Sequence, residues 1–82
     1  SPVSGIRMEM YTTQPGVQLY TGNFLSTSNI VGKGGKSYAD RAGFCLETQH
    51  YPNAMEHPEF PSVVLLAGEL YDTTTEYHIS LL

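Results

Sequence analysis

The sequence predicts an all-β fold built from antiparallel strands. Two observations lead to this class. Short segments in which apolar and polar residues alternate with period two are separated by stretches rich in Gly, Pro and Ser. No window of 11 residues carries a convincing apolar stripe at the 3.6-residue period of a helix. We find no internal repeat and no linker that would divide the chain, so residues 1–82 are expected to form a single unit with about five strands.

The first two strands are predicted on either side of a tight turn. Residues 5–12 alternate Ile, Met and Met with Arg, Glu and Tyr, which indicates a strand with one apolar face and one face exposed to solvent. The segment Gln14-Pro15-Gly16 is a turn signal, because proline fixes its own φ and glycine permits positive φ. A second strand over residues 17–20 places Val17 and Leu19 on one face and Gln18 on the other.

The remaining elements follow from composition as much as from alternation. Residues 21–42 are rich in Gly, Ser, Asn and Lys and are expected to form a long excursion. Residues 44–49 read as the next strand, and three prolines exclude a regular helix or a central strand over residues 51–61. The apolar run at residues 63–66 predicts a strand buried on both faces, and renewed alternation predicts a last strand over residues 75–82.

Length and composition suggest that other protein covers part of this chain. A domain of 82 residues buries only about 60 to 65% of the surface that its unfolded form exposes. One cysteine cannot form an internal disulfide, so this usual support for a small core is absent. Charged residues make up only 15% of the chain, which is few for a small body that is fully surrounded by water.

Charge and hydropathy argue against nucleic-acid and membrane partners. The net charge is −4, and the four basic residues are spread along the chain rather than clustered. No apolar run reaches the roughly 18 residues needed to cross a bilayer, and the N-terminus lacks the layout of a signal peptide. Cys45, between Phe44 and Leu46, is expected to be an inert core thiol in a reducing compartment, which favours a soluble, cytoplasmic protein.

Three segments together resemble a known family. They are the stretch Gly43-Phe44-Cys45-Leu46-Glu47-Thr48-Gln49 and the denser segments at residues 11–25 and 60–72. In this order and spacing they resemble the C-terminal part of the aldose 1-epimerase family, and the resemblance runs from about Arg7 to about Ser80. Family enzymes are considerably longer, so residues 1–82 are expected to be a single C-terminal fragment of an aldose 1-epimerase β-sandwich domain.

The resemblance implies a fold, an activity and a partner. The fold would be part of a large, mutarotase-like β-supersandwich. The activity would be interconversion of the α and β anomers of free hexoses such as galactose and glucose, with no metal and no cofactor. The general acid of the family is a histidine in the upstream part, so an upstream N-terminal polypeptide of the same enzyme is the expected partner, and the isolated chain is expected to be inactive.

Two residues match functional positions of the family, and a third lies on the same strand face as one of them. Glu47 resembles the general base, and a carboxylate on a largely apolar strand suits that role because desolvation raises the affinity of a carboxylate for protons. The alternative is an edge carboxylate that faces water or pairs with Arg41 or Arg7. Gln18 matches a position that hydrogen-bonds sugar hydroxyls, although it could be a polar cap on the strand. Gln49 shares the face of Glu47 and would orient it, contact sugar or simply be solvated.

Other candidates are weaker. His50, His57 and His78 are each expected to be surface or strand-face residues rather than catalysts or metal ligands. The segment at residues 32–37 lacks the glycine spacing of a phosphate-binding P-loop and is expected to be a surface turn. Tyr20 and Phe24 could stack on a sugar ring, although aromatic residues in β sequences are more often core. The alternative to an epimerase is a non-catalytic sugar-binding or structural piece of a β-sandwich.

Overall fold

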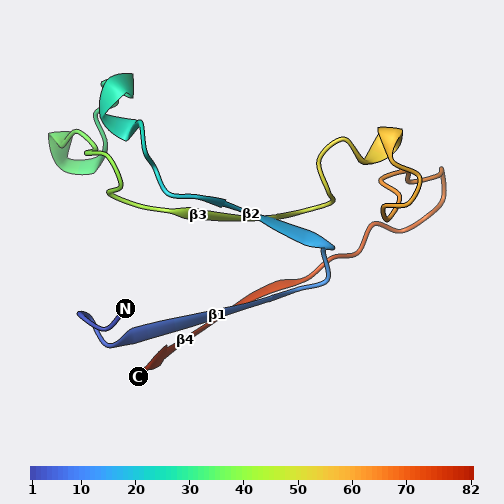
Figure 1. Cartoon of the computed structure of the whole chain (residues 1–82), viewed down its shortest axis with the longest axis horizontal. Helices are drawn as coiled ribbons and strands as arrows, with labels where there is room; N and C mark the ends of the chain where they lie inside the picture. The colour runs from blue at the N-terminus through green and yellow to red at the C-terminus, as the bar shows by residue number, and fades with distance from the viewer. The chain divides into compact units, whose positions relative to one another are not determined.

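The computed structural model describes all of residues 1–82 and confirms an all-β chain (Figure 1). Its four strands are β1 (Ile6–Thr12), β2 (Gly16–Tyr20), β3 (Cys45–Gln49) and β4 (Thr75–Leu81). Three short 3-10 helices occupy the connections: η1 (Leu25–Ser28), η2 (Lys33–Gly35) and η3 (Ala54–Glu56). The strands form two sheets of two strands each, β1 with β4 and β2 with β3. The chain divides into two compact units, residues 1–16 with 48–82 and residues 17–47, so the boundary crosses β2 and β3.

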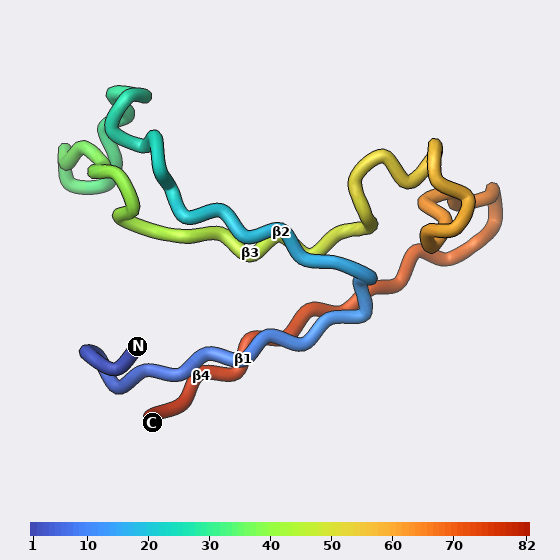
Figure 2. Tube along the Cα trace, viewed as in Figure 1, coloured from blue at the N-terminus to red at the C-terminus, as the bar shows by residue number.

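The sheet of β1 and β4 is an antiparallel ladder with two different faces (Figure 2). The pairs alternate between the faces, because successive side chains of a strand point in opposite directions. One face carries apolar pairs: Ile6 with Leu81, Met8 with Ile79, and Met10 with Tyr77. The other carries polar pairs: Arg7 with Ser80, Glu9 with His78, and Tyr11 with Glu76. The alternation predicted from both segments is therefore confirmed.

The predicted turn between the first two strands is present. The backbone bends at residues 13–15 and the next strand begins at Gly16. Gly16 lies against the ring of Tyr51, where a Cβ atom would come within 3.0 Å of the ring atom Cε1 and 3.6 Å of the carbonyl oxygen of Gln49. Any larger residue would have to displace the ring, so glycine is favoured here by the close approach of Tyr51; its φ is not positive, so the backbone conformation alone does not require glycine.

The predicted strand at residues 63–66 is wrong. These residues form no strand, and their side chains are 41 to 62% exposed. A strand buried on both faces needs neighbours in its sheet and a layer above and below it, and no segment of this chain supplies them. The chain turns directly afterwards, where the Glu69 amide donates to the Leu66 carbonyl at 3.1 Å.

The preceding stretch agrees with the sequence reading. Residues 51–61 contain no regular helix or strand, only the single turn η3. The ring of Phe60 packs against Tyr51 and His57, with centroid distances of 5.1 Å and 4.8 Å. The segment therefore contains a small aromatic cluster although it has no regular secondary structure.

No side chain of the chain is buried. The expectation that Cys45 is a core thiol is therefore wrong: it is a free, exposed cysteine. Its flanking residues are apolar as a core would need, but Phe44 is 61% exposed and Leu46 is only half-buried. The apolar pattern of the sequence is thus intact while the packing that it predicts is missing from these 82 residues.

Candidate active site

Glu47 occupies the central position of β3, as predicted, with an exposed side chain. It forms no hydrogen bond or ion pair. The cations that could have paired with it have other partners, since Arg7 Nη2 lies 2.8 Å from Glu9 Oε1 and Arg41 Nη1 donates to Asn23 Oδ1 at 3.4 Å. Glu47 does not line the cavities beside Tyr11, Tyr71 and Phe60. A carboxylate without a partner is available to accept a proton, but these residues do not supply the desolvation that a general base needs.

Gln18 occupies the central position of β2, the strand that pairs with β3. Two predicted site residues, Gln18 and Glu47, are thereby brought into one two-stranded sheet although 28 residues separate them in sequence, and Figure 1 shows the two strands running in opposite directions. The Gln18 side chain is exposed and makes no hydrogen bond, so both its donors and its acceptor are available to a ligand.

Gln49 ends β3 and is half-buried. It lies two residues after Glu47, which puts the two side chains on the same side of the strand. Its amide forms no hydrogen bond with Glu47 or with any other residue. The structure thus agrees with the shared face, whereas a role in orienting the carboxylate remains a prediction.

The excursion that joins β2 to β3 is closed by specific hydrogen bonds. The Arg41 amide donates to the Gly22 carbonyl at 2.7 Å, and the Ser26 amide donates to Asp40 Oδ1 at 2.9 Å. The backbone hydrogen bond from Ser26, followed by the side-chain hydrogen bond from the same residue, lowers the pKa of Asp40 below its ordinary value. These bonds return the chain so that β3 can lie beside β2.

Within this excursion, residues 32–37 form the surface turn that the sequence predicts. Val31 and Ser37 form an isolated antiparallel bridge, and the Gly32 amide donates to the Lys36 carbonyl at 2.8 Å. Gly34 and Gly35 have φ values of 71° and 72°, in the region that favours glycine.

The histidines occupy exposed or half-buried positions and engage nearby groups. His57 Nδ1 lies 3.1 Å from Glu59 Oε1, and His78 Nε2 lies 2.9 Å from Glu76 Oε2. His50 lines a cavity beside Gln14 and Tyr71. No three His, Cys, Asp or Glu side chains come together in a way that could hold a metal ion. Surface or strand-face positions were predicted for all three histidines, and this is where they lie.

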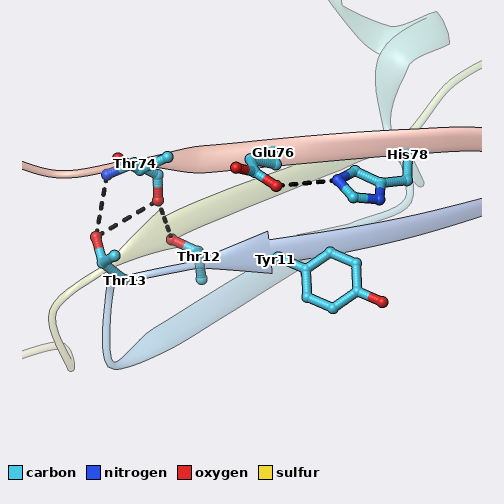
Figure 3. A pocket seen from close by; sticks show the side chains of 6 residues that line it. All are labelled: Tyr11, Thr12, Thr13, Thr74, Glu76 and His78. Atoms are coloured by element: carbon cyan, nitrogen blue, oxygen red, sulfur yellow. Dashed lines mark hydrogen bonds and ion pairs between the residues drawn. The ribbon is translucent and has the colours of Figure 1, made fainter.

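A cavity on the sheet of β1 and β4 was not predicted. It is a groove of about 280 Å³ lined by Tyr11, Thr12, Thr13, Thr74, Glu76 and His78 (Figure 3). The rings of Tyr11 and His78 lie 4.9 Å apart on one side of it. The threonine runs at residues 12–13 and 73–75 were the signal available in the sequence, but a threonine run alone does not distinguish a cluster of hydroxyls from ordinary strand residues.

Comparison with known proteins defines the class. A family model described as aldose 1-epimerase matches residues 1–78. Because this match covers nearly the whole chain, the chain belongs to the aldose 1-epimerase family.

Particular relatives carry more specific names. Galactose mutarotase from Bos taurus and from Homo sapiens are each 54% identical to the chain over 78 residues, which is 95% of this chain and 22% of each relative. Aldose 1-epimerase from Escherichia coli is 39% identical over 74 residues, or 88% of this chain and 21% of the relative. The chain therefore spans about a fifth of the length of these relatives.

None of its helices could span a membrane.

Proposed function

We propose that this chain is the part of an aldose 1-epimerase that carries the general base, and that the complete protein interconverts the anomers of a free hexose such as galactose or glucose. The observation that carries the proposal is the 54% identity to galactose mutarotase across 95% of the chain, a region that includes Glu47 and Gln18. The pairing of β2 with β3 supports it, because both residues then belong to one sheet.

The chemistry assigns a defined role to each residue. The Glu47 carboxylate accepts the proton of the C1 hydroxyl while an acid protonates the ring oxygen, so that the bond between C1 and the ring oxygen breaks and an open-chain aldehyde forms. Rotation about the bond between C1 and C2 exposes the other face of the aldehyde. The reverse proton transfers then close the ring on that face. Gln18 holds a sugar hydroxyl during these steps, and Gln49 contacts sugar or orients Glu47. No metal or cofactor is required by this sequence of proton transfers.

The acid and further sugar contacts are supplied, in this proposal, by an upstream polypeptide of the same enzyme. Two observations support this. The chain spans 22% of the length of galactose mutarotase, and its apolar sheet face and apolar run at residues 63–66 are exposed. Contact with the upstream part would remove water from these surfaces and from Glu47. We expect the isolated chain to be inactive.

The proposed setting is the cytoplasm, without a nucleic-acid or membrane partner. A free and exposed Cys45 thiol suits a reducing compartment. The net charge of −4 and the dispersed basic residues do not suit binding to a phosphate backbone.

The direct test is Glu47→Gln in the full-length protein that contains this segment, with mutarotation of α-D-galactose followed by polarimetry and galactose binding measured separately. We expect turnover to fall about 10²- to 10⁴-fold, the usual contribution of a positioned base, while binding persists. The second candidate function, a non-catalytic sugar-binding or structural piece, is favoured by the exposure of Glu47, which does not line the cavities beside Tyr11, Tyr71 and Phe60. Unchanged turnover in Glu47→Gln would establish that second function for this segment.

A further inference from the structure

Three threonine hydroxyls form a connected chain that joins three strands. Thr75 Oγ1 on β4 lies 3.1 Å from Thr12 Oγ1 on β1 and 3.1 Å from Thr48 Oγ1 on β3. All three residues are half-buried, in a chain whose other side chains are mostly exposed. The contacts link positions 63 and 27 residues apart in sequence, so they constrain the path of the backbone rather than a local turn.

The direction of the hydroxyl chain follows from the remaining partners. Thr12 Oγ1 accepts from the Gln14 amide at 3.1 Å and can donate to the Thr74 carbonyl at 3.3 Å. If Thr48 donates to Thr75 and Thr75 donates to Thr12, every hydroxyl hydrogen has an acceptor. The opposite direction would leave the Thr48 hydrogen without one. The satisfied direction is the favourable one, because a half-buried polar group without a partner is costly.

The backbone around Thr75 is itself held firmly. The Thr13 amide donates to the Thr74 carbonyl at 3.0 Å. The Thr74 amide donates to Thr13 Oγ1 at 3.0 Å, a hydrogen bond that is drawn in Figure 3. Thr75 therefore projects its hydroxyl from a fixed point where β4 begins.

Thr48 directly follows Glu47 in β3, and its side chain points to the opposite side of the strand. The hydrogen bond from Thr48 to Thr75 thus fixes the backbone one residue from the proposed base, without occupying the side on which the base works. We infer that Thr75 is a positioning residue for Glu47, an inference that rests on the proposed function.

Such a role has a recognisable kinetic consequence. A small displacement of a reacting group slows the chemical step strongly, by as much as about 100-fold for roughly 1 Å. Substrate binding depends on other contacts, among them the one proposed for Gln18. Loss of the Thr75 hydroxyl should therefore lower kcat and leave KM nearly unchanged.

The test compares three variants of the full-length protein that contains this segment. Thr75→Val replaces the hydroxyl by a methyl group of similar size, and Thr75→Ser retains the hydroxyl. Thr74→Val is the matched control, because the Thr74 side chain forms no hydrogen bond and only its backbone is used. With α-D-galactose as the probe, we expect kcat to fall about 10- to 100-fold in Thr75→Val. We expect kcat within about threefold of the parent protein in Thr75→Ser and Thr74→Val, and KM within about threefold in all three variants.

The inference is overturned by full kcat in Thr75→Val, or by equal losses in Thr75→Ser and Thr75→Val. It is also overturned if Thr74→Val loses as much kcat as Thr75→Val, since the effect would then be general destabilisation. If Thr75→Val does not fold, Thr48→Val removes the same hydrogen bond from its other end and is judged by the same kinetic criterion. Glu47→Gln separates the two proposals: full activity in that variant rejects the proposed function, whereas loss there with full activity in Thr75→Val rejects only the positioning role.

Discussion

Met8 on β1 is paired with Ile79 on β4, and both side chains are exposed, to 37% and 64%. They lie on a sheet face on which three successive pairs are apolar and only the last pair, Thr12 with Thr75, is polar, while the opposite face carries Arg7, Glu9 and His78. An apolar face of this kind is stable in water only when another layer covers it. If the proposed upstream polypeptide exists, this apolar face is the surface on which we expect it to pack.

A charge on this face should destabilise the full-length protein. We expect Ile79→Glu to lower the free energy of unfolding by about 2 kcal/mol or more, because the carboxylate would be buried without a partner. Ser80→Glu is the matched control, since Ser80 lies on the polar face opposite Arg7, and its effect should stay within about 0.5 kcal/mol. Denaturant unfolding measures both. Equal effects of the two substitutions would mean that no layer covers the apolar face.

The proposed sugar contact of Gln18 should appear in catalytic efficiency. Gln18→Leu keeps the approximate size of the side chain and removes its hydrogen-bonding groups. A typical hydrogen bond contributes about 0.5 to 1.5 kcal/mol, so kcat/KM for galactose should fall about 2- to 13-fold. Gln49→Leu distinguishes the two roles proposed for Gln49: a raised KM indicates contact with sugar, whereas a lowered kcat at unchanged KM indicates that Gln49 orients Glu47. Steady-state polarimetry distinguishes the two, and an unaltered kcat/KM in Gln18→Leu would leave Gln18 as a polar cap on its strand.

How much could be predicted from the sequence differs between elements for physical reasons. The four strands were predictable because alternation with period two is a local property, and the turn before Gly16 was predictable from Pro15. The strand predicted at residues 63–66 was wrong, because an apolar segment indicates burial without indicating which part of the protein buries it. The exposure of Cys45 has the same cause.

Some features of the candidate site could also be predicted from the sequence, and others could not. The residue types at Glu47 and Gln18 suggest acid–base and hydroxyl-binding chemistry, but the pairing of β2 with β3 was not predicted, because the long excursion between these strands leaves their partners open. The contact of Thr75 with Thr48 could not be predicted either, because it depends on the tertiary position of two hydroxyls 27 residues apart. Local periodicity carries no information about such a contact.

Glycine at position 22 should be essential for the connection between β2 and β3. Its φ is +72°, and a Cβ atom would lie 3.1 Å from the carbonyl oxygen of Gly43, a backbone atom that cannot easily move. Gly34 is the matched control, because its φ is +71° but nothing lies within 4 Å of its Cβ position. The left-handed backbone alone costs a non-glycine residue about 1 to 2 kcal/mol, so Gly34→Ala should lose that amount and Gly22→Ala clearly more. Thermal unfolding of the full-length variants measures the difference, and equal losses would show that the close approach to Gly43 is relieved.

Acid should weaken the hydrogen bond between the Ser26 amide and Asp40, which helps to close the connection between β2 and β3. The hydrogen bond from the Ser26 backbone lowers the pKa of Asp40 below the ordinary 3.8, so the folded state binds this proton more weakly than the unfolded state does. The stabilisation is therefore fully present above the unfolded pKa and is lost as the pH falls through the folded pKa. Below about pH 3.8, hydrogen exchange at the Ser26 amide should accelerate, relative to its intrinsic acid-dependent rate, in step with protonation of Asp40. NMR of the carboxyl carbon and the amide measures both events. Asp40→Asn keeps an oxygen acceptor but has no proton to gain, so it should remove the pH dependence of protection at Ser26, and titration of Asp40 at or above 3.8 would contradict the assignment.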